Sequence, residues 1–158
     1  MRSEPVADLE LRPAAPEDLD AVARMFSASR RAAVPAMPPP VHTVEEDRVW
    51  LGHQLGGERE AWLAERGTTV LGLMLLEEGW LHSLYVDPAH QGQGVGTALL
   101  QLAKALRPSG LQLWVFQSNL PARRLYAAHG FVDVEETDGS RNDEQAPDVR
   151  MRWLPGDR

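Results

Sequence analysis

The stretch Asp87–Leu100 reads DPAHQGQGVGTALL and places three glycines at alternate positions directly before an apolar, helix-like run. Glycine loses more conformational entropy on folding than other residues, so it is a poor start for a helix unless something must approach the backbone. Closely spaced glycines at a strand-to-helix turn expose unpaired N–H groups at the positive end of the helix, which attracts phosphate. The alternative interpretation is a tight strand-to-helix turn in which glycine only allows unusual backbone dihedral angles. One glycine would be enough for such a turn.

The length and composition indicate a single globular domain over residues 1–158, with 43% hydrophobic and 25% charged residues. The chain has no cysteine, which excludes disulfides, thiolate metal sites and a cysteine nucleophile. A net charge of −7 argues against a nucleic-acid partner. No apolar run is long enough to span a membrane, and the acidic N-terminal segment lacks the apolar centre of an export signal. We therefore expect a cytoplasmic protein.

Hydrophobic periodicity and turn residues predict the order of the secondary structure. A capping box at Thr43 and Glu46 opens the second predicted helix, which ends near Leu55 before two glycines. The expected elements are a strand at 9–14, helices from Pro16 and from Thr43, a hairpin around Gly67, a strand ending before Pro88, a helix over Val95–Leu106, a strand at 111–116, a short helix from Pro121, and a terminal hairpin. This βααβββαβαββ order indicates an α/β layered domain with a mixed sheet.

Two nucleotide-binding motifs fail at the glycine-rich stretch. A dinucleotide fingerprint beginning at Gly92 would need glycine or alanine where Thr97 stands, and no G-K-[ST] follows as a P-loop requires. Instead, Gln91–Gly96 resembles the [Q/R]-x-x-G-x-[G/A] pyrophosphate loop of the GNAT superfamily of N-acetyltransferases. About 30 residues later, NLPARRLYAAHGF (Asn119–Phe131) resembles the N-x-x-A-x-x-x-Y-x-x-x-G-F signature of that family. The resemblance covers nearly the whole chain.

The resemblance implies a GNAT-like fold, with a central, mixed but mostly antiparallel sheet flanked by about four helices. It implies an acetyl-CoA-dependent N-acetyltransferase that acts on a primary amine, taken here to be a small molecule's, by direct attack in a ternary complex. A backbone N–H near Val86 would face the thioester oxygen, and one such donor can stabilise the transition state by about 3 kcal/mol. The residues expected to bind coenzyme A are Leu84, Tyr85, Val86, Gln91, Gly92, Gln93, Gly94, Val95, Gly96, Thr97, Asn119 and Tyr126.

Acetyl transfer also needs an acid and a base. Tyr126 is the candidate general acid, since a phenol with a pKa near 10 can protonate a departing thiolate whose thiol has a pKa of about 8.5. The alternative is that Tyr126 is a tyrosine of the hydrophobic core without a catalytic role. Glu78 is the first candidate for the general base and His82 is the second. The alternative for Glu78 is that it is an ordinary solvent-exposed carboxylate of a hairpin. Strand alternation places His82 on the side of Leu84 and Val86, and a β-bulge would reverse that placement.

The acceptor side carries weaker signals. The five histidines lack metal-ligand spacing, so no metal is expected. Met37 and Val41 lie in a proline-rich loop that could line a pocket, and the acidic loop Thr137–Asp148 would favour a cationic amine. A peptide amine remains an alternative acceptor, and either a monomer or a homodimer is compatible with the sequence. A non-catalytic acyl-CoA-binding regulator on the same fold is the alternative function, and the presence of Tyr126 favours catalysis.

Overall fold

The computed structural model describes residues 8–156, so the outermost residues of the predicted 1–158 domain lie outside the described residues. Residues 1–7, the first part of the N-terminal segment that we interpret as lacking an export signal, are among them. Within the described part of the chain, every helix is too short or too polar to span a bilayer.

A seven-stranded mixed sheet carries the fold, with the strand order β1-β2-β3-β4-β5-β7-β6. Only β4 and β5 are parallel, and all other neighbours are antiparallel. The predicted α/β class and the mostly antiparallel sheet are confirmed. In chain order the elements are β1 (Glu10–Pro13), α1 (Leu19–Ala32), α2 (Val44–His53), β2 (Glu60–Arg66), β3 (Thr69–Glu77), β4 (Trp80–Val86), α3 (Val95–Leu106), β5 (Leu111–Phe116), α4 (Leu120–Ala128), β6 (Val132–Thr137) and β7 (Asp148–Trp153).

The helix boundaries follow local sequence signals. Thr43 Oγ1 accepts from the N–H of Glu46 at 3.1 Å, and the Glu46 carboxylate accepts from the N–H of Thr43 at 2.8 Å, which confirms the predicted capping box of α2. The α-helical part of α2 ends at His53, two residues earlier than expected. A π-helical turn, Gln54–Glu58, follows and ends the helix with Gly57 at a φ of 109°.

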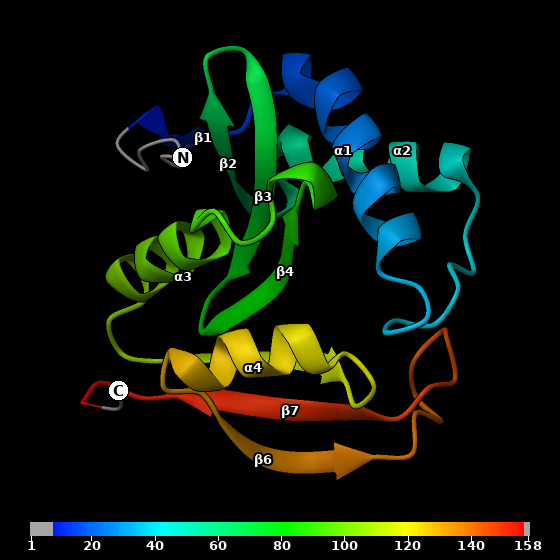
Figure 1. Ribbon diagram of the computed structural model, residues 1–158, viewed down its shortest axis with the longest axis vertical. Helices are drawn as coiled ribbons and strands as arrows, with labels where there is room; N and C mark the ends of the chain where they lie inside the picture. The colour runs from blue at the N-terminus through cyan, green and yellow to red at the C-terminus, as the bar shows by residue number, and fades with distance from the viewer. Residues whose placement is uncertain (1–7, 157–158) are drawn as a thin grey trace, which may run out of the picture.

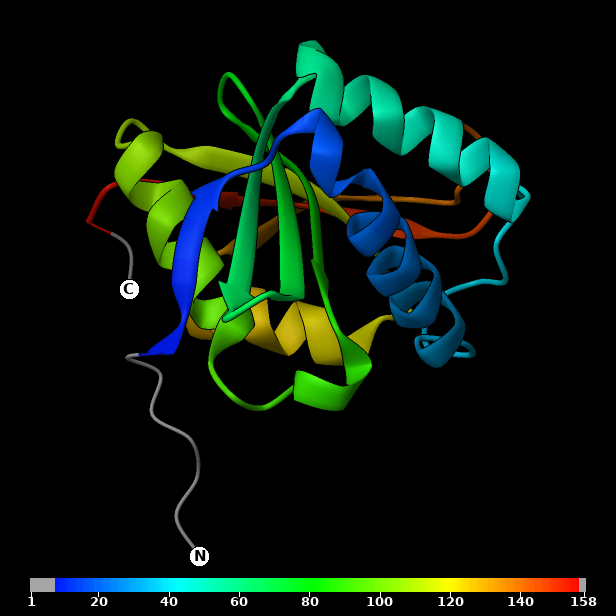
Figure 2. The same cartoon turned by 90° about the horizontal axis from the view of Figure 1, so that it is seen from above.

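The four helices cover the two faces of the sheet in pairs. Helices α1 and α2 pack their apolar residues on one face of β2–β4, and α3 and α4 pack on the other face, which extends to β5 and β7. Figure 2 shows α1 and α2 together on one side of β2–β4 and α3 on the other. Each face therefore has its own hydrophobic core, and burial of these apolar side chains is the main force that stabilises the fold.

Strands β4 and β5 part almost as soon as they meet. Their pairing is recorded only at Trp80 and Gln112, whereas β5 pairs with β7 along its whole length. Figure 1 shows the consequence: β2–β4 run in a clearly different direction from β6 and β7. The C-terminal half of β4 is thus left with one unpaired edge in the middle of the sheet.

The close approach of α3 to this open end depends on a glycine in β3. A Cβ atom at Gly72 would lie 3.0 Å from Leu99 Cδ1 and 3.1 Å from both Val95 Cγ1 and the carbonyl oxygen of Tyr85. Gly72 pairs with Val86 at the end of β4. The missing side chain therefore allows the first turns of α3 to lie directly on the strands that border the gap.

Replacing Gly72 with valine is expected to destabilise the fold by about 1–3 kcal/mol, because the added carbons overpack the contact with α3. Urea unfolding followed by circular dichroism measures this change. Gly56→Val is the matched control, since a Cβ there meets nothing within 4 Å, and it should cost less than about 1 kcal/mol. Equal destabilisation by the two variants would contradict the proposed packing role of Gly72.

Candidate active site

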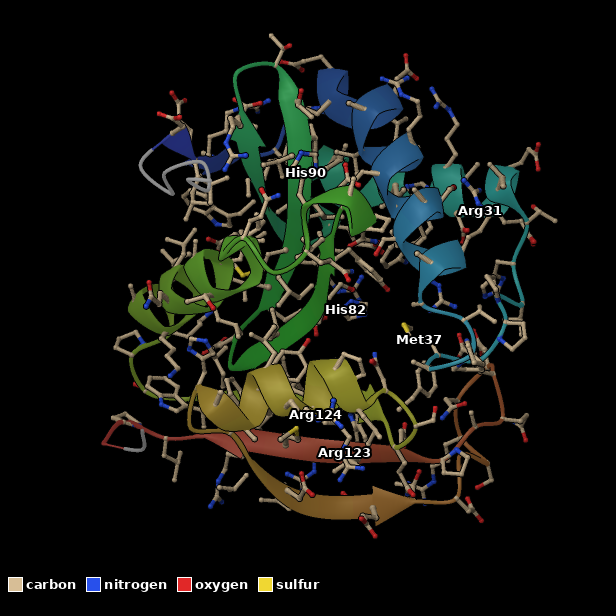
Figure 3. The ribbon with its side chains drawn as sticks, in the orientation of Figure 1. Arg31, Met37, His82, His90, Arg123 and Arg124 are labelled. Carbon is tan, nitrogen blue, oxygen red and sulfur yellow. The ribbon has the colours of Figure 1, made fainter. Side chains whose placement is uncertain are left out.

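The gap between β4 and β5 opens into a cleft of about 1750 Å³. Its walls come from α1, the α1–α2 loop, α2, β4, the β4–α3 loop, β5, α4 and the loop between β6 and β7. In Figure 3, His82 and Met37 lie in the space between α1 and α4. The cleft thus joins both motifs that the sequence singled out with the region expected to receive an acceptor.

The glycine-rich loop presents a row of free amides to this cleft. Within residues 8–156, no backbone N–H from Gln91 to Thr97 donates a hydrogen bond, and the first amide used by α3 is that of Ala98, which donates to Gly94 at 2.9 Å. Gly92 and Gly94 adopt φ values of 80° and 84°, which turn the chain into the helix. Free amides that converge at a helix N-terminus form a site for an anion such as a diphosphate.

The three glycines do not share one role. Gly92 and Gly94 do adopt the unusual dihedral angles of the alternative interpretation. Gly96 lies within α3, where a Cβ would be 3.1 Å from Leu125 Cδ2 and 3.8 Å from Val86 Cγ2. The missing side chain of Gly96 therefore allows close packing of α3 against α4 and β4, in addition to leaving its amide free within the described residues.

The open edge of β4 adds further donors. The N–H of Asp87 donates to Leu71 in β3 at 2.8 Å. Because donors alternate between the two edges of a strand, the N–H groups of Leu84 and Val86 point away from β3. They face the gap left by β5. The Tyr85 side chain projects to the other face of the sheet, where its ring packs edge-on against Phe26 at 4.6 Å.

Helix α4 brings the second motif to the same cleft. Asn119 caps the helix, with its Oδ1 accepting from the N–H of Ala122 at 3.4 Å, and it also lines the cleft. Tyr126 is only 8% exposed, and its ring packs on Phe131 at 5.8 Å between centroids. Burial raises the pKa of the Tyr126 phenol, and the neighbouring Tyr85 raises it further. The Tyr126 hydroxyl group therefore stays protonated at neutral pH.

A β-bulge decides where His82 points. Leu76 pairs with Leu81 and Leu75 pairs with Ser83, so His82 is the extra residue in β4. Its ring lies 5.9 Å from that of Trp50, on the α2 side, and its Nδ1 is 2.7 Å from Ser83 Oγ. The placement from simple alternation, beside Leu84 and Val86, is wrong because the bulge reverses it. Partial burial, followed by the charge of Arg59, lowers the pKa of His82, which is therefore neutral at neutral pH.

Two residues singled out from the sequence lie away from the cleft lining. Glu78 is exposed at the turn between β3 and β4 and is not among the lining residues. Gln93 is exposed as well, with its side-chain oxygen 3.4 Å from Arg66 Nη1. The remaining residues expected at the site, including Tyr126 and His82, all line the cleft.

The part of the cleft lined by α1, the α1–α2 loop and α2, called the acceptor half below, contains groups that the sequence analysis did not identify. Phe26 and Arg30 reach it from α1, and Asp47 and Trp50 reach it from α2. Arg30 could have been found, because it continues the buried i, i+4, i+8 stripe of Val22 and Phe26. Asp47 and Trp50 gave no comparable signal, since α2 has few buried residues.

Two further expectations concerned the acceptor side and metal binding. Met37 lines the cleft as expected, whereas Val41 is 51% exposed and does not, so that prediction is wrong for Val41. Among the described residues, no group of three or more histidine, aspartate or glutamate side chains is placed to hold a metal ion.

Comparisons with known proteins agree with this geometry. Residues 22–131 match the family model described as "Acetyltransferase (GNAT) family". YwnH of Bacillus subtilis (strain 168), provisionally named a phosphinothricin acetyltransferase, is 28% identical over 85% of this chain and 94% of its own. The peptidyl-lysine N-acetyltransferase YiaC of Escherichia coli (strain K12) is 36% identical over 58% of this chain and 62% of its own.

The fold is also found among solved structures. The PaiA N-acetyltransferase from Thermoplasma acidophilum, solved in complex with coenzyme A, superposes with a TM-score of 0.77 at 19% identity, covering 92% of this chain and 98% of that one. A GCN5-related N-acetyltransferase from Rhodopseudomonas palustris gives 0.77 at 24% identity, covering 98% of both chains. The chain belongs to the GNAT family and is an acetyl-CoA-dependent N-acetyltransferase.

Proposed function

We propose that this protein transfers the acetyl group of acetyl-CoA to the primary amine of a small molecule, by direct attack within a ternary complex. The observation that carries the proposal is the run of free amides along one continuous cleft. These amides extend from the Gln91–Thr97 loop to the open edge of β4, and Tyr126 lies in the same cleft. The loop suits a diphosphate and the strand edge suits an extended amide-containing arm, so both parts of coenzyme A find matching donors.

The reacting centre is assigned to the end of β4. The N–H of Val86 offers a hydrogen bond to the thioester oxygen, which gains negative charge as the amine attacks. The new C–N bond forms while the C–S bond breaks, and the sulfur leaves with the electron pair. Tyr126 supplies the proton that this sulfur needs. Burial raises the pKa of the Tyr126 hydroxyl, which keeps it protonated in the free protein but also makes it a weaker acid. Transfer of the proton to a thiolate whose thiol has a pKa of about 8.5 therefore requires direct contact with the departing sulfur.

His82 is the better candidate base of the two considered. An attacking amine must lose a proton, and the neutral imidazole of His82 faces the cleft and can accept it, directly or through water. Glu78 would have to act from an exposed turn outside the cleft lining. We therefore assign the proton-accepting role to His82.

A small acceptor suits the walls of the cleft better than an extended peptide. Ser118 Oγ donates to the carbonyl oxygen of Ala36 at 2.6 Å, and His42 Nε2 lies 3.4 Å from Asp143 Oδ2. The α1–α2 loop therefore contacts both the β5–α4 turn and the acidic loop between β6 and β7. These contacts enclose the acceptor half from several sides.

Replacing Tyr126 with phenylalanine tests the acid role. The variant should lower kcat by about 100-fold, because general acid catalysis commonly contributes a factor of this size. Acetyl-CoA affinity should stay within about twofold, since the ring and its packing on Phe131 are kept. Thiol release measured over a panel of amines, together with calorimetry of acetyl-CoA binding, checks both values. An unchanged kcat would remove Tyr126 from the mechanism.

The environment of His82 makes a second prediction. Its pKa, followed by NMR titration, should lie below the ordinary value of about 6.5, and Trp50→Ala should raise it because water replaces the covering ring. Trp114→Ala is the control: this tryptophan is 45% exposed on β5, and among the described residues its ring makes no ring contact with His82. A wild-type pKa above 6.5 would contradict the expected direction, and one above about 7 would leave His82 mostly charged at neutral pH and count against its role as a base.

A further inference from the structure

Arg30 is an arginine of the cleft wall that has no carboxylate at ion-pair distance within the described residues. Arg30 lies near the C-terminal end of α1 and lines the cleft, and 9% of the residue is exposed. Within the described residues it forms no ion pair. Its one hydrogen bond runs from Nη1 to Met37 Sδ at 3.4 Å, and a thioether is a weak acceptor. Most of its five N–H donors therefore lack a protein acceptor.

Nε and Nη2 of Arg30 have no protein acceptor within the described residues, and they are not fully shielded from solvent, so the cleft leaves them open to a ligand. Arginines that are largely covered by protein are normally paired with carboxylates. The partly buried Arg12 shows such pairing, since Asp18 and Glu65 each hold it at 2.8 Å. Arg30 departs from this pattern inside the cleft where a second substrate is expected to bind.

The surroundings of Arg30 place it close to the reacting centre. Its charge is near enough to the phenol of Tyr85 and to the carboxylate of Asp47 to affect the pKa of both groups. Tyr85 directly precedes Val86, whose N–H points into the gap. The acceptor half therefore holds a positive group, Arg30, and a negative group, Asp47, within electrostatic reach of each other, and neither forms an ion pair within the described residues.

We propose that Arg30 binds a carboxylate of the acceptor, so that the preferred substrate is a free α-amino acid or a similar small amine with a neighbouring carboxylate. The inference rests on the acetyltransferase function proposed above and makes Arg30 a specificity-determining residue. A guanidinium can bind a carboxylate through two parallel N–H···O bonds, which fixes both position and orientation. The nearby Asp47 carboxylate complements the ammonium group on arrival, before His82 takes its proton.

Matched acceptors test the inference. Thiol release from acetyl-CoA is measured with the common amino acids, with their carboxamides and with the corresponding decarboxylated amines. The carboxylate form of the best acceptor should exceed both neutral forms about 10- to 100-fold in kcat/KM, the range expected for charge-assisted hydrogen bonds. Equal or faster turnover of the neutral forms would overturn the inference while leaving the acetyltransferase proposal intact.

Arg30→Met removes the charge and keeps an unbranched apolar stem. It should abolish the preference by lowering kcat/KM for the carboxylate acceptor about 10- to 100-fold, with the neutral acceptors and the KM for acetyl-CoA changed less than about threefold. Arg31→Met is the matched control, because Arg31 is exposed on the same turn and does not line the cleft (Figure 3). Equal losses for charged and neutral acceptors in Arg30→Met would overturn the inference.

Two readouts distinguish carboxylate binding by Arg30 from a purely structural role. If Arg30 were only structural, Arg30→Met would lower Tm, whereas loss of a solvent-accessible charge that has no ion-pair partner should leave Tm nearly unchanged. Binding of N-acetyl amino acids in the presence of coenzyme A needs no catalysis, because these products keep the carboxylate. Binding that wild type shows and Arg30→Met loses supports the carboxylate site even if Tyr126→Phe shows no effect. No binding of any N-acetyl amino acid to wild type overturns it.

Discussion

Strands β4 and β5 pair at one position, Trp80 with Gln112, and then diverge. The rest of the site depends on this divergence. In a fully paired sheet, the second edge of β4 would be used by its neighbour, because backbone groups are normally satisfied within the ladder. Here β5 pairs with β7 instead, so the N–H groups of Leu84 and Val86 remain open to the cleft. Tyr126, on α4, lines the cleft into which this gap opens.

Backbone amides explain how an acidic protein can bind a polyanionic ligand. The chain has a net charge of −7, and acidic side chains gather in the loop between β6 and β7. We assign the diphosphate to backbone amides at the start of α3, which carry partial positive charge without adding cationic side chains. The acidic groups and Arg30 lie on the acceptor side. The two halves of the cleft thus suit ligands of different charge, which favours binding of both at once.

Much of the fold could be predicted from the sequence, because its signals are local. The helix Val95–Leu106 and the capping box at Thr43 follow from periodicity and side-chain chemistry within a few residues. The meeting of the Gln91–Thr97 loop and Tyr126 in one cleft could be expected from the motifs, whereas their binding and catalytic roles stay predictions. The orientation of His82 was not, since a β-bulge arises from the pairing of two strands and leaves no mark in one strand's own sequence. Arg30 was overlooked for a different reason, because an arginine near the end of a helix is usually a solvated residue that complements the dipole.

The central claim is that the free amides of residues 91–97 hold the diphosphate of coenzyme A. Amide hydrogen exchange of these residues, measured with and without coenzyme A, tests it most directly. We predict fast exchange in the free protein, since these N–H groups have no partner within the described chain, and exchange about 100-fold slower at a ligand concentration of about 100 times Kd. Tight binding of coenzyme A with no added protection of these amides would contradict the claim.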